Sequence, residues 1–392
     1  MRKSRQEYNE IRERERQNKE YYSRPDGKAA CPHTICISVN NRCNMKCRMC
    51  DIGKANRERH DIGKEPDGYL AKRYVKENRY IEFPIERLEA LVDEVADFQP
   101  TIKANFVEPL TYGSLCRFAQ YVKRNGLKFY TITNGWLLER NAEWIVEEGV
   151  DLIRISMDGT EPVHDDIRGI TGSFLKTVNG IERLLELKKK KNKSTPIIGI
   201  CLTISNYNYL NLVDFMDELN RRKWLNDIYI NFNHLLYTTG WEVEATRQES
   251  SLFDGIAMCS MDDIHFDQFD IHAFNGQIAR LHQKYDPTQY HYYFSPALSP
   301  NDLEVYYNPA SRMYPGTPCY LPWYAAQIEV NGDVGIYGHC ILPSLGNIMA
   351  QGFHDVWNSP RALEIRRELR AAGSFTACNK CIGTLYPLRG RD

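Results

Sequence analysis

Six strand-like segments alternate with amphipathic helical segments, and this alternation constrains the fold more than any other feature of the chain. The strand-like segments are almost continuously apolar, as strands covered on both faces are; they span residues 34–40, 101–107, 127–133, 150–156, 196–205 and 226–233. Apolar spacing of i, i+3, i+4 predicts helices over residues 85–98, 114–125, 137–149, 174–191 and 209–223. Such alternation forms parallel βαβ units with right-handed crossovers. We expect an α/β fold, either an incomplete barrel or an open doubly wound sheet, with ligands at the carboxyl ends of the strands.

The alternation stops near residue 234, where the composition changes. Residues 234–316 hold many aromatic residues, prolines and acids, and predict a connecting region with short elements at best. Residues 325–337 predict a hairpin with an Asn-Gly-Asp turn, and residues 360–372 predict a helix. The expected organisation is a polar N-terminal arm (1–30), a partial barrel (31–235), a connecting or substrate region (236–316) and a small C-terminal domain (317–392).

Composition excludes several classes of partner and leaves the cysteines to be explained. The net charge is −1 at pH 7, which favours neither nucleic acid nor an anionic membrane. No apolar run approaches the roughly 20 residues that span a bilayer, and the charged N-terminus is not a secretory signal. We therefore expect a cytoplasmic protein with no nucleic-acid or membrane partner. Because that compartment keeps thiols reduced, metal ligation is the first explanation for its 12 cysteines.

Three cysteines lie in the loop that leaves the first strand. Cys43, Cys47 and Cys50 have the spacing C-x3-C-x2-C. Thiolates hold cubane iron–sulfur clusters, and three of them leave the fourth iron open to a substrate. A zinc ion is the alternative, and it would need a fourth ligand such as Cys36 or His33.

The sequence CNMKCRMC at residues 43–50 resembles the cluster loop of the radical S-adenosylmethionine (SAM) enzymes. The resemblance runs over most of the chain from about residue 31, and it implies a partial (β/α)6 TIM barrel. It also implies that the open iron binds the amine and carboxylate of SAM. A reduced cluster would then cleave SAM to a 5′-deoxyadenosyl radical, which removes a hydrogen atom from the substrate. A flavodoxin- or ferredoxin-type protein would supply the electron.

The same resemblance implies which residues contact SAM. Residues 106–110 (FVEPL) stand where the family usually has Gly-Gly-Glu-Pro, so that Glu108 would contact the SAM amino group. Phe106 and Val107 replace the two glycines, which normally permit unusual backbone angles. The other implied contacts, from the ends of later strands and from the cluster loop, are Asn134, Ser156, Arg168 and the backbone of Met49. Asp158 is expected to organise its turn.

A second cysteine set lies in the C-terminal part, with the spacing C-x20-C-x37-C-x2-C. Four thiolates can close a metal site completely, and from the spacing alone a structural zinc is an alternative. The segment resembles the SPASM/twitch extension of radical SAM enzymes, a small α+β domain that carries auxiliary 4Fe–4S clusters. No further cysteine follows, which implies one auxiliary cluster with an electron-transfer role. Its ligands would be Cys319, Cys340, Cys378 and Cys381, so that the cofactors are SAM and two 4Fe–4S clusters.

The outcome of the radical reaction is less constrained. Cys201, in the fifth strand, and Cys259, in the connecting region, are candidate thiols that return a hydrogen atom to a substrate radical, as an epimerase requires. Relatives with a four-cysteine extension imply a small substrate such as a polyol, sugar or nucleotide-linked sugar, which is dehydrogenated or epimerised. An acid among Asp262, Asp263, Asp267 and Asp270 is a candidate base. A peptide-modifying maturase is an alternative, and a non-enzymatic zinc-binding interaction protein is an alternative of another class.

Overall fold

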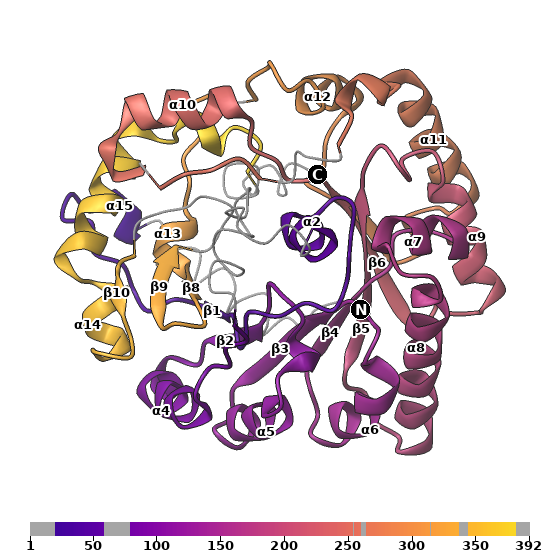
Figure 1. Cartoon of the computed structure of the whole chain (residues 1–392), viewed down its shortest axis with the longest axis horizontal. Coiled ribbons are helices and arrows are strands. Elements are labelled where there is room, and N and C mark those ends of the chain that lie inside the picture. The colour runs from indigo at the N-terminus through magenta and orange to yellow at the C-terminus, as the bar shows by residue number, and fades with distance from the viewer. Residues whose placement is uncertain are drawn as a thin grey trace.

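The computed structural model describes residues 20–58, 79–253, 255–259, 264–313, 315–336 and 344–381. In this part of the chain ten strands form one continuous sheet, in the order β10-β9-β8-β1-β2-β3-β4-β5-β6-β7. Figure 1 shows the sheet with helices α4, α5, α6 and α8 on its outer side and α2 on its inner side. The strands are β1 (Thr34–Ile37), β2 (Thr101–Ala104), β3 (Lys128–Thr133), β4 (Leu152–Ser156), β5 (Ile197–Ile204), β6 (Ile228–His234), β7 (Tyr292–Ser295), β8 (Ala325–Ile328), β9 (Asp333–Ile336) and β10 (Gly346–Asn347).

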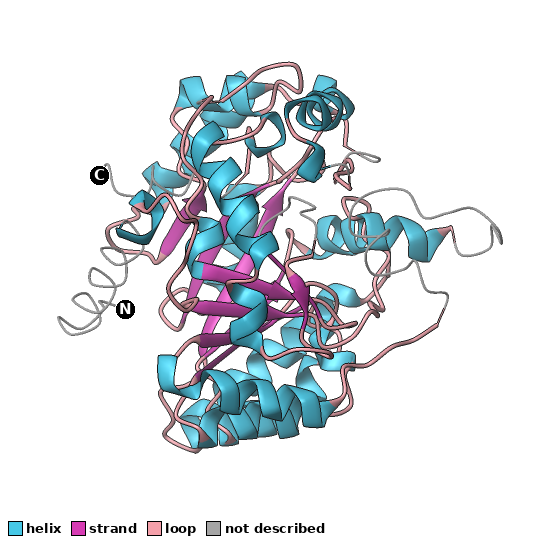
Figure 2. Cartoon of the chain, turned by 90° about the vertical axis from the view of Figure 1, so that its left-hand side faces the viewer, coloured by secondary structure: helices cyan, strands magenta, loops and turns pink. Residues whose placement is uncertain are grey.

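Helices connect the strands and surround them, as Figure 2 shows from the side. The described α-helices are α2 (Asp51–Arg57), α4 (Ile85–Val95), α5 (Leu115–Arg124), α6 (Leu138–Glu147), α7 (Glu161–Arg168), α8 (Ser173–Lys190), α9 (Leu212–Arg221), α10 (Gly240–Glu249), α11 (Ile271–Lys284), α12 (Pro300–Tyr306), α13 (Leu321–Tyr324), α14 (Phe353–Trp357) and α15 (Pro360–Ala372). Short 3-10 helices are η1 (Ala96–Phe98), η2 (Pro109–Thr111), η3 (Ser251–Phe253), η4 (Phe266–Gln268) and η5 (Thr376–Cys378). Within the described residues, no helix combines the length and apolar character needed to cross a membrane.

All six predicted strands are present, and β1 to β6 pair in parallel in sequence order. The five predicted helices correspond to α4 with η1, α5, α6, α8 and α9, and their ends differ from the predicted ends by a few residues at most. This is the parallel βαβ architecture that the alternation predicts. It forms the partial barrel implied by the family resemblance.

The prediction that the connecting region contains short elements at best is wrong. This region contains the 14-residue helix α11 and a seventh parallel strand, β7, which pairs with β6. Aromatic side chains account for this strand, because the rings of Tyr292 and Phe294 lie 5.9 Å and 5.1 Å from the ring of Phe232 on β6. Aromatic residues favour strands when they can pack against a neighbouring strand in this way.

The C-terminal part is joined to the barrel through the sheet itself. The predicted hairpin is present as β8 and β9, which pair antiparallel, and the predicted helix over residues 360–372 is α15. Strand β8 also pairs in parallel with β1, with Thr34 opposite Ala325 and Ile37 opposite Ile328. The strand that precedes the cysteine loop is therefore held between β2 and a strand from the C-terminal part.

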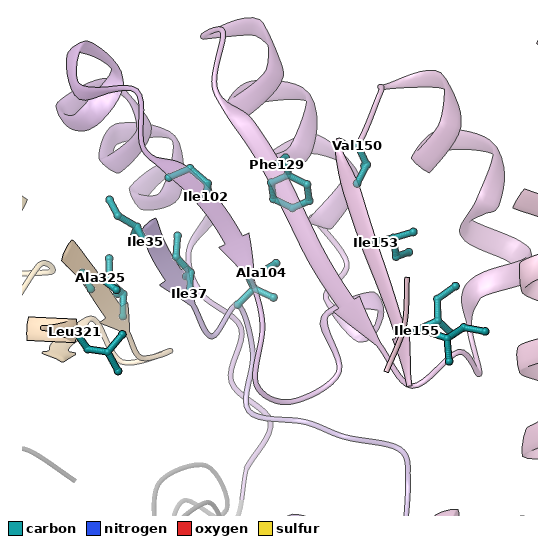
Figure 3. Close-up of a cluster of buried hydrophobic side chains, with 14 of the residues drawn as sticks. Ile35, Ile37, Ile102, Ala104, Phe129, Val150, Ile153, Ile155, Leu321 and Ala325 are labelled. Atoms are coloured by element: carbon teal, nitrogen blue, oxygen red, sulfur yellow. The ribbon is translucent and has the colours of Figure 1, made fainter. Parts of the chain in front are cut away.

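The two faces of the sheet differ in chemistry. On the outer face Ile35, Ile102, Phe129 and Ile153 are completely buried against the helices (Figure 3). Each such side chain contributes roughly 1.5–3 kcal/mol by its burial. On the inner face the alternate positions are polar at many places and keep part of their surface accessible, as at Lys103 in β2. The outer face holds the fold together, and the inner face is available for ligands.

Candidate active site

The loop between β1 and α2 carries three of the cysteines and is held in place by the helix that follows it. Asn56, in α2, donates a side-chain hydrogen bond to the carbonyl oxygen of Cys43 (2.9 Å), and Arg57 donates to that of Cys47 (2.6 Å). Gly53 permits this close packing, because a Cβ atom there would lie 2.1 Å from the Cys47 carbonyl oxygen. Helix α2 therefore holds the backbone of the loop and leaves the three thiols of the loop available.

The three thiols of the loop lie near one another in apolar surroundings. Cys47 is buried, whereas Cys43 and Cys50 keep part of their surface accessible and pack beside Ile52 and Val107. Burial raises the pKa of all three thiols, and burial together with the neighbouring Cys47 raises that of Cys50 to about 12. Thiols in such a site become thiolates when a metal centre binds them.

Two side chains from other elements point hydrogen-bond donors at these sulfur atoms. Nη1 of Arg168 lies 3.7 Å from Sγ of Cys47, and Nδ2 of Asn134 lies 3.9 Å from Sγ of Cys43. Hydrogen bonds to ligating sulfur tune the potential of an iron–sulfur cluster. In the described part of the chain, no three His, Cys, Asp or Glu side chains are placed to hold a single metal ion. The thiols and their donors fit a cluster that is ligated by sulfur.

Glu108 lies between the ends of β2 and β3 and is 1% exposed. Its Oε1 accepts hydrogen bonds from the Leu110 amide (3.1 Å) and the Thr133 hydroxyl (2.8 Å), and its Oε2 accepts from the Asn134 amide (2.7 Å). Burial raises the pKa of this carboxyl to about 7, although the three hydrogen bonds act in the opposite direction. Because each carboxylate oxygen can accept two hydrogen bonds, Oε2 retains one position for a further donor.

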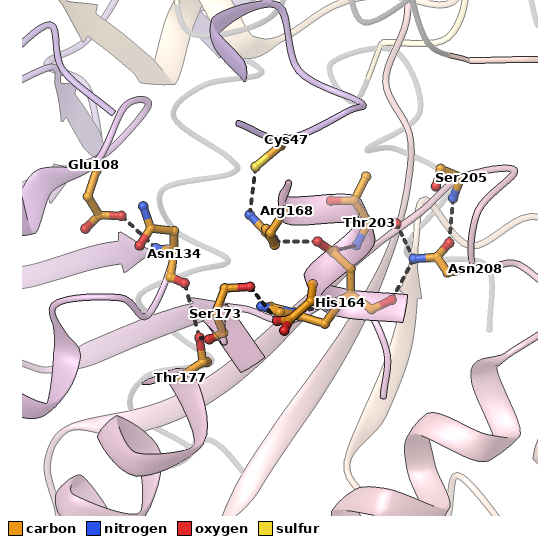
Figure 4. A network of polar contacts seen from close by, with 12 residues as sticks. Cys47, Glu108, Asn134, His164, Arg168, Ser173, Thr177, Thr203, Ser205 and Asn208 are labelled. Carbon is orange, nitrogen blue, oxygen red and sulfur yellow. Dashed lines mark hydrogen bonds and ion pairs between the residues drawn. The ribbon is translucent and has the colours of Figure 1, made fainter. Parts of the chain in front are cut away.

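Arg168, at the end of α7, joins a buried carboxylate to the cysteine loop (Figure 4). Its Nη2 lies 2.6 Å from Oδ2 of Asp158, and both side chains are buried. Asp158 also accepts a hydrogen bond from the Thr203 amide (3.0 Å), and its own amide donates to His164 Nδ1 (3.1 Å). Nε of Arg168 is buried without a partner among the described residues, so this guanidinium has a donor available.

Phe106 adopts the backbone conformation that glycine normally supplies. Its φ angle is +83°, in the left-handed region that a bulky side chain rarely occupies. Such a conformation costs of order 1–3 kcal/mol and persists only where the surroundings impose it. The Phe106 side chain packs against the cluster of Ile52 and Val107, as Cys43 and Cys50 also do. The backbone conformation that glycine provides in other members of the family is therefore present here, although phenylalanine occupies the position.

Comparison with known protein families agrees with this geometry. The model of the radical SAM superfamily matches residues 37–219, which include the end of the first predicted strand, the cysteine loop and the second to fifth predicted strands. The model of the SPASM iron–sulfur cluster-binding domain matches residues 319–382. The chain is a radical SAM protein with a SPASM domain. These domains bind SAM and 4Fe–4S clusters, which the three-thiol loop and its donors fit.

Individual relatives of this radical SAM protein have varied names. Fe-coproporphyrin III synthase of Methanosarcina barkeri is 28% identical over 202 residues, which are 51% of this chain and 43% of that protein. A probable GTP 3′,8-cyclase of Methanococcus maripaludis is 27% identical over 152 residues, 38% of this chain and 45% of that protein. The chain thus spans less than half of the length of these two curated relatives.

Solved structures match a larger share of the radical SAM protein. SuiB of Streptococcus suis bound to S-adenosylmethionine has a TM-score of 0.55 over 93% of this chain and 74% of that chain, at 14% identity. Native anSMEcpe with bound AdoMet has a TM-score of 0.54 over 86% of this chain and 83% of that chain, at 16% identity. At such low identity the two likenesses establish the fold.

The structure brings some of the other predicted residues of the radical SAM domain to the same end of the sheet. Ser156 is the last residue of β4, on the inner face, and it is partly exposed. The side chain of Met49 is buried and packs with Ile167, Leu235 and Ile264. A contact between Met49 and a ligand would therefore involve its backbone, as the family resemblance implies.

The two candidate hydrogen-atom donors occupy different places. Cys201 lies on the inner face of β5 directly opposite Ser156, and burial raises the pKa of its thiol. Cys259 lies beyond the end of β6, where its backbone pairs with that of Thr238, and it is 1% exposed. Cys201 is thus the candidate that shares a face with the carboxyl-end residues.

The acids of the connecting region are only partly described. Asp262 and Asp263 lie outside the described residues. Asp267 and Asp270 are exposed, and Asp270 accepts a hydrogen bond from the Ala273 amide (2.8 Å). Asp270 therefore caps the N-terminus of α11.

In the SPASM domain the structure brings three of the four predicted cysteines together. Cys319, Cys378 and Cys381 are buried, at 8%, 4% and 7% exposure. Burial raises the pKa of the Cys319 thiol, and the neighbouring Cys378 and Cys381 raise it further. Cys340 lies outside the described residues, as do residues 1–19 of the predicted arm.

Sequence reasoning missed two residues of these sites, Asn44 and Lys380, and one role, that of Asp158 toward Arg168. Asn44 accepts a hydrogen bond from Asn134 Nδ2 (2.8 Å) inside the cysteine loop. Asp158 holds Arg168 as well as its own turn. Lys380, between two cysteines of the SPASM domain, is 1% exposed, with its Nζ 4.5 Å from the ring centroid of Tyr237. A lysine between two closely spaced cysteines was a visible signal for the last of these, whereas the first two depend on tertiary contacts.

Proposed function

We propose that this protein is an enzyme in which Cys43, Cys47 and Cys50 hold a 4Fe–4S cluster whose open iron binds SAM. The observation that carries the proposal is the convergence of three clustered thiols with donors from Arg168 and Asn134 at the carboxyl ends of the strands. When bound, the cluster and SAM supply a 5′-deoxyadenosyl radical, and a flavodoxin- or ferredoxin-type protein supplies the electron. The substrate lies on the inner face of the sheet and loses a hydrogen atom there.

The residues of this chain bind and orient SAM. Oε2 of Glu108 has one acceptor position left, which suits the SAM amino group. Nε of Arg168 is a buried donor that suits the SAM carboxylate, or an oxygen of its ribose. The polar side chains of Asn134 and Ser156 and the backbone of Met49 complete the site. Asp158 is a positioning residue, because it holds Arg168 in place.

The second cluster is proposed to be bound by Cys319, Cys340, Cys378 and Cys381. Four protein ligands leave no iron open, so its role is to accept or return an electron rather than to bind substrate. Lys380, between two of these cysteines in the sequence, is buried, and its Nζ donates to the carbonyl oxygen of Asn308 (2.8 Å).

We propose a small substrate, such as a polyol, sugar or nucleotide-linked sugar, and either dehydrogenation or epimerisation. Epimerisation requires a thiol that returns a hydrogen atom. Cys201 is the better candidate, because it lies on the inner face of the sheet opposite Ser156, and burial raises the pKa of its thiol, so that it keeps its S–H bond. Cys259 stays the second candidate.

The test is deuterium transfer from labelled candidate substrates into 5′-deoxyadenosine under reducing, anaerobic conditions. Transfer identifies the substrate and the carbon attacked, and failure to form 5′-deoxyadenosine under any condition contradicts the proposal. Solvent deuterium retained in the product distinguishes epimerisation from dehydrogenation. Cys201→Ala should abolish that incorporation, whereas Cys116→Ala on the outer helix α5 serves as the matched control. If Cys201→Ala and Cys259→Ala both leave deuterium incorporation intact, neither thiol is the donor.

A further inference from the structure

Two cations face the inner side of the barrel, and the described residues provide neither of them with an anionic partner. Lys103 in β2 and Arg154 in β4 alternate with Ile102, Ile153 and Ile155, which are completely buried on the helix side of the same strands. Both cations keep part of their surface accessible. Among the described residues, neither has a carboxylate partner. A cation inside a protein is costly unless it is paired, so this arrangement calls for a functional explanation.

The contacts that these cations do make leave their charges available. Nε of Arg154 donates a hydrogen bond to the hydroxyl of Tyr229 (3.0 Å), which leaves both terminal nitrogens of the guanidinium. Nζ of Lys103 lies 5.9 Å from the ring centroid of Tyr130, a weak contact that uses none of its hydrogen-bond donors. Burial lowers the pKa of Lys103, and the charge of Arg154 acts in the same direction. The two cations therefore act on one another, and a shared anion would relieve their repulsion.

Glycine at position 199 makes room for this geometry. Gly199 lies on β5 between Arg154 and Tyr229 in the register of the sheet. A Cβ atom there would lie 2.2 Å from the Tyr229 ring, so any side chain would displace the ring that orients Arg154. The absence of a side chain at position 199 therefore allows the Tyr229 ring to lie where its hydroxyl accepts the hydrogen bond from Arg154.

A further polar group on the same face lacks a partner. Oδ1 of Asn231 is buried and accepts no hydrogen bond from the described residues, while its Nδ2 donates to Asn233 (2.8 Å). The rings of Tyr229 and Tyr293 are nearly parallel, at 14°, with centroids 6.2 Å apart. A ligand could donate a hydrogen bond to Oδ1 of Asn231, and a ring of the ligand could pack against the two tyrosines.

We infer that Lys103 and Arg154 form a binding site for an oxyanion, a carboxylate or phosphate group of the substrate, on the inner face of the barrel. The free guanidinium fork of Arg154 suits two oxygens of such a group, and Lys103 adds a second positive charge. Arg154 precedes Ser156 by two residues on the same face, about 7 Å along the strand. The anion would hold the substrate beneath the carboxyl-end residues. The inference rests on the proposed function, and it narrows the substrate to an acid, a phosphate ester or a nucleotide-linked sugar rather than a neutral polyol.

The test measures anion binding to the anaerobic, cluster-loaded protein in the presence of SAM by titration calorimetry. Inorganic pyrophosphate and malonate serve as the phosphate and carboxylate probes. We expect at least one to bind, and Lys103→Met and Arg154→Met to weaken its binding roughly 10- to 100-fold. Arg154→Lys, which keeps the charge but loses the fork, should recover part of the affinity. Tyr229→Phe, which only frees the guanidinium, should have a smaller effect.

Lys176→Met and Arg221→Met remove exposed cations from the outer helices α8 and α9, and they should leave anion binding unchanged. Binding of one probe alone supports the inference and identifies the anion class. The inference is overturned if neither probe binds, or if the outer variants weaken binding as much as the inner ones. The change in the cluster's electron paramagnetic resonance spectrum on adding SAM is recorded with the same wild-type samples. If that change occurs without anion binding, only the oxyanion site fails; if it is absent, the proposed function itself fails.

Discussion

The two groups of cysteines differ in how far the protein encloses them. In the loop after β1 only Cys47 is buried, and Cys43 and Cys50 keep part of their surface accessible. In the SPASM domain Cys319, Cys378 and Cys381 are all buried. Accessible sulfur ligands suit a cluster that must admit another molecule, whereas enclosed ligands suit one that exchanges only electrons.

Their polar surroundings differ as well. Polar side chains border the loop. Asn134 and Arg168 direct hydrogen-bond donors at its sulfur atoms, and Oε2 of Glu108 accepts one hydrogen bond and can accept another. At the SPASM site a large aromatic side chain lies close to the cysteines: Tyr306 is completely buried near Cys381. This difference supports the proposed division of roles, in which the first site binds SAM and the second exchanges electrons.

The strongest way to break this comparison is to remove one ligand from each site. Cys47→Ala should abolish 5′-deoxyadenosine formation, and Cys378→Ala should spare cleavage of SAM while abolishing substrate turnover. Each variant should lose about four of the roughly eight irons expected for two cubane clusters. Iron analysis and chromatographic detection of 5′-deoxyadenosine measure both effects. The proposed division of roles fails if Cys378→Ala is as deficient in SAM cleavage as Cys47→Ala.

A smaller effect is expected from the ion pair that braces the open site. Asp158→Asn leaves Arg168 buried without its counter-charge, which should lower the free energy of unfolding by about 3–5 kcal/mol. SAM affinity should also fall, by roughly tenfold, because the guanidinium loses its fixed position. Thermal unfolding and SAM titration test this. Exposed Asp166→Asn, which removes a surface partner of Arg48, is the matched control and should cost less than about 1 kcal/mol.

Glu108 provides a pH-dependent comparison. Its pKa is raised to about 7 by burial, so below pH 7 the carboxyl of the SAM-free protein is protonated and binds an amino group less well. SAM affinity should therefore increase up to about tenfold between pH 6 and pH 8. Glu108→Gln should bind SAM more weakly at pH 8 and should lack this component of the pH dependence. An equal pH dependence in both proteins would assign the titration to another group.

The smallest predicted effect concerns the backbone at Phe106. Phe106→Gly and Phe106→Ala both remove the ring, but only glycine adopts a φ of +83° without strain. The glycine variant should be more stable than the alanine variant by about 1 kcal/mol, the reverse of the usual order. Chemical denaturation of the two variants measures the difference. A more stable alanine variant would show that the left-handed conformation is not retained.

The repeated strands and the cysteine loop could be predicted because their signals are local. Runs of apolar residues mark β1 to β6, and the spacing of Cys43, Cys47 and Cys50 needs no tertiary information. Glu108 and Asn134 could be named because the family resemblance implies SAM contacts at these positions, and both motifs follow strands directly, at the edge of a parallel sheet where ligands bind.

The rest depends on which residues meet in three dimensions. Strand β7 was missed because its aromatic residues lie in a segment whose composition resembles that of a loop. The contact with Phe232 that stabilises the strand is visible only in the structure. The contact of Asp158 with Arg168 joins the turn after β4 to the end of α7. Lys103 and Arg154 each interrupt an apolar run, but only the curvature of the sheet brings them to a common inner face.

The pairing of β1 with β8 has a consequence for synthesis of the chain. The strand leading to the cysteine loop acquires one of its two neighbours only when Thr34 meets Ala325, after most of the polypeptide has been made. Until then one edge of that strand is unprotected, and unpaired edges invite aggregation. Insertion of iron and sulfur into the loop, if it accompanies translation, must occur on a barrel whose first strand is still exposed on one side.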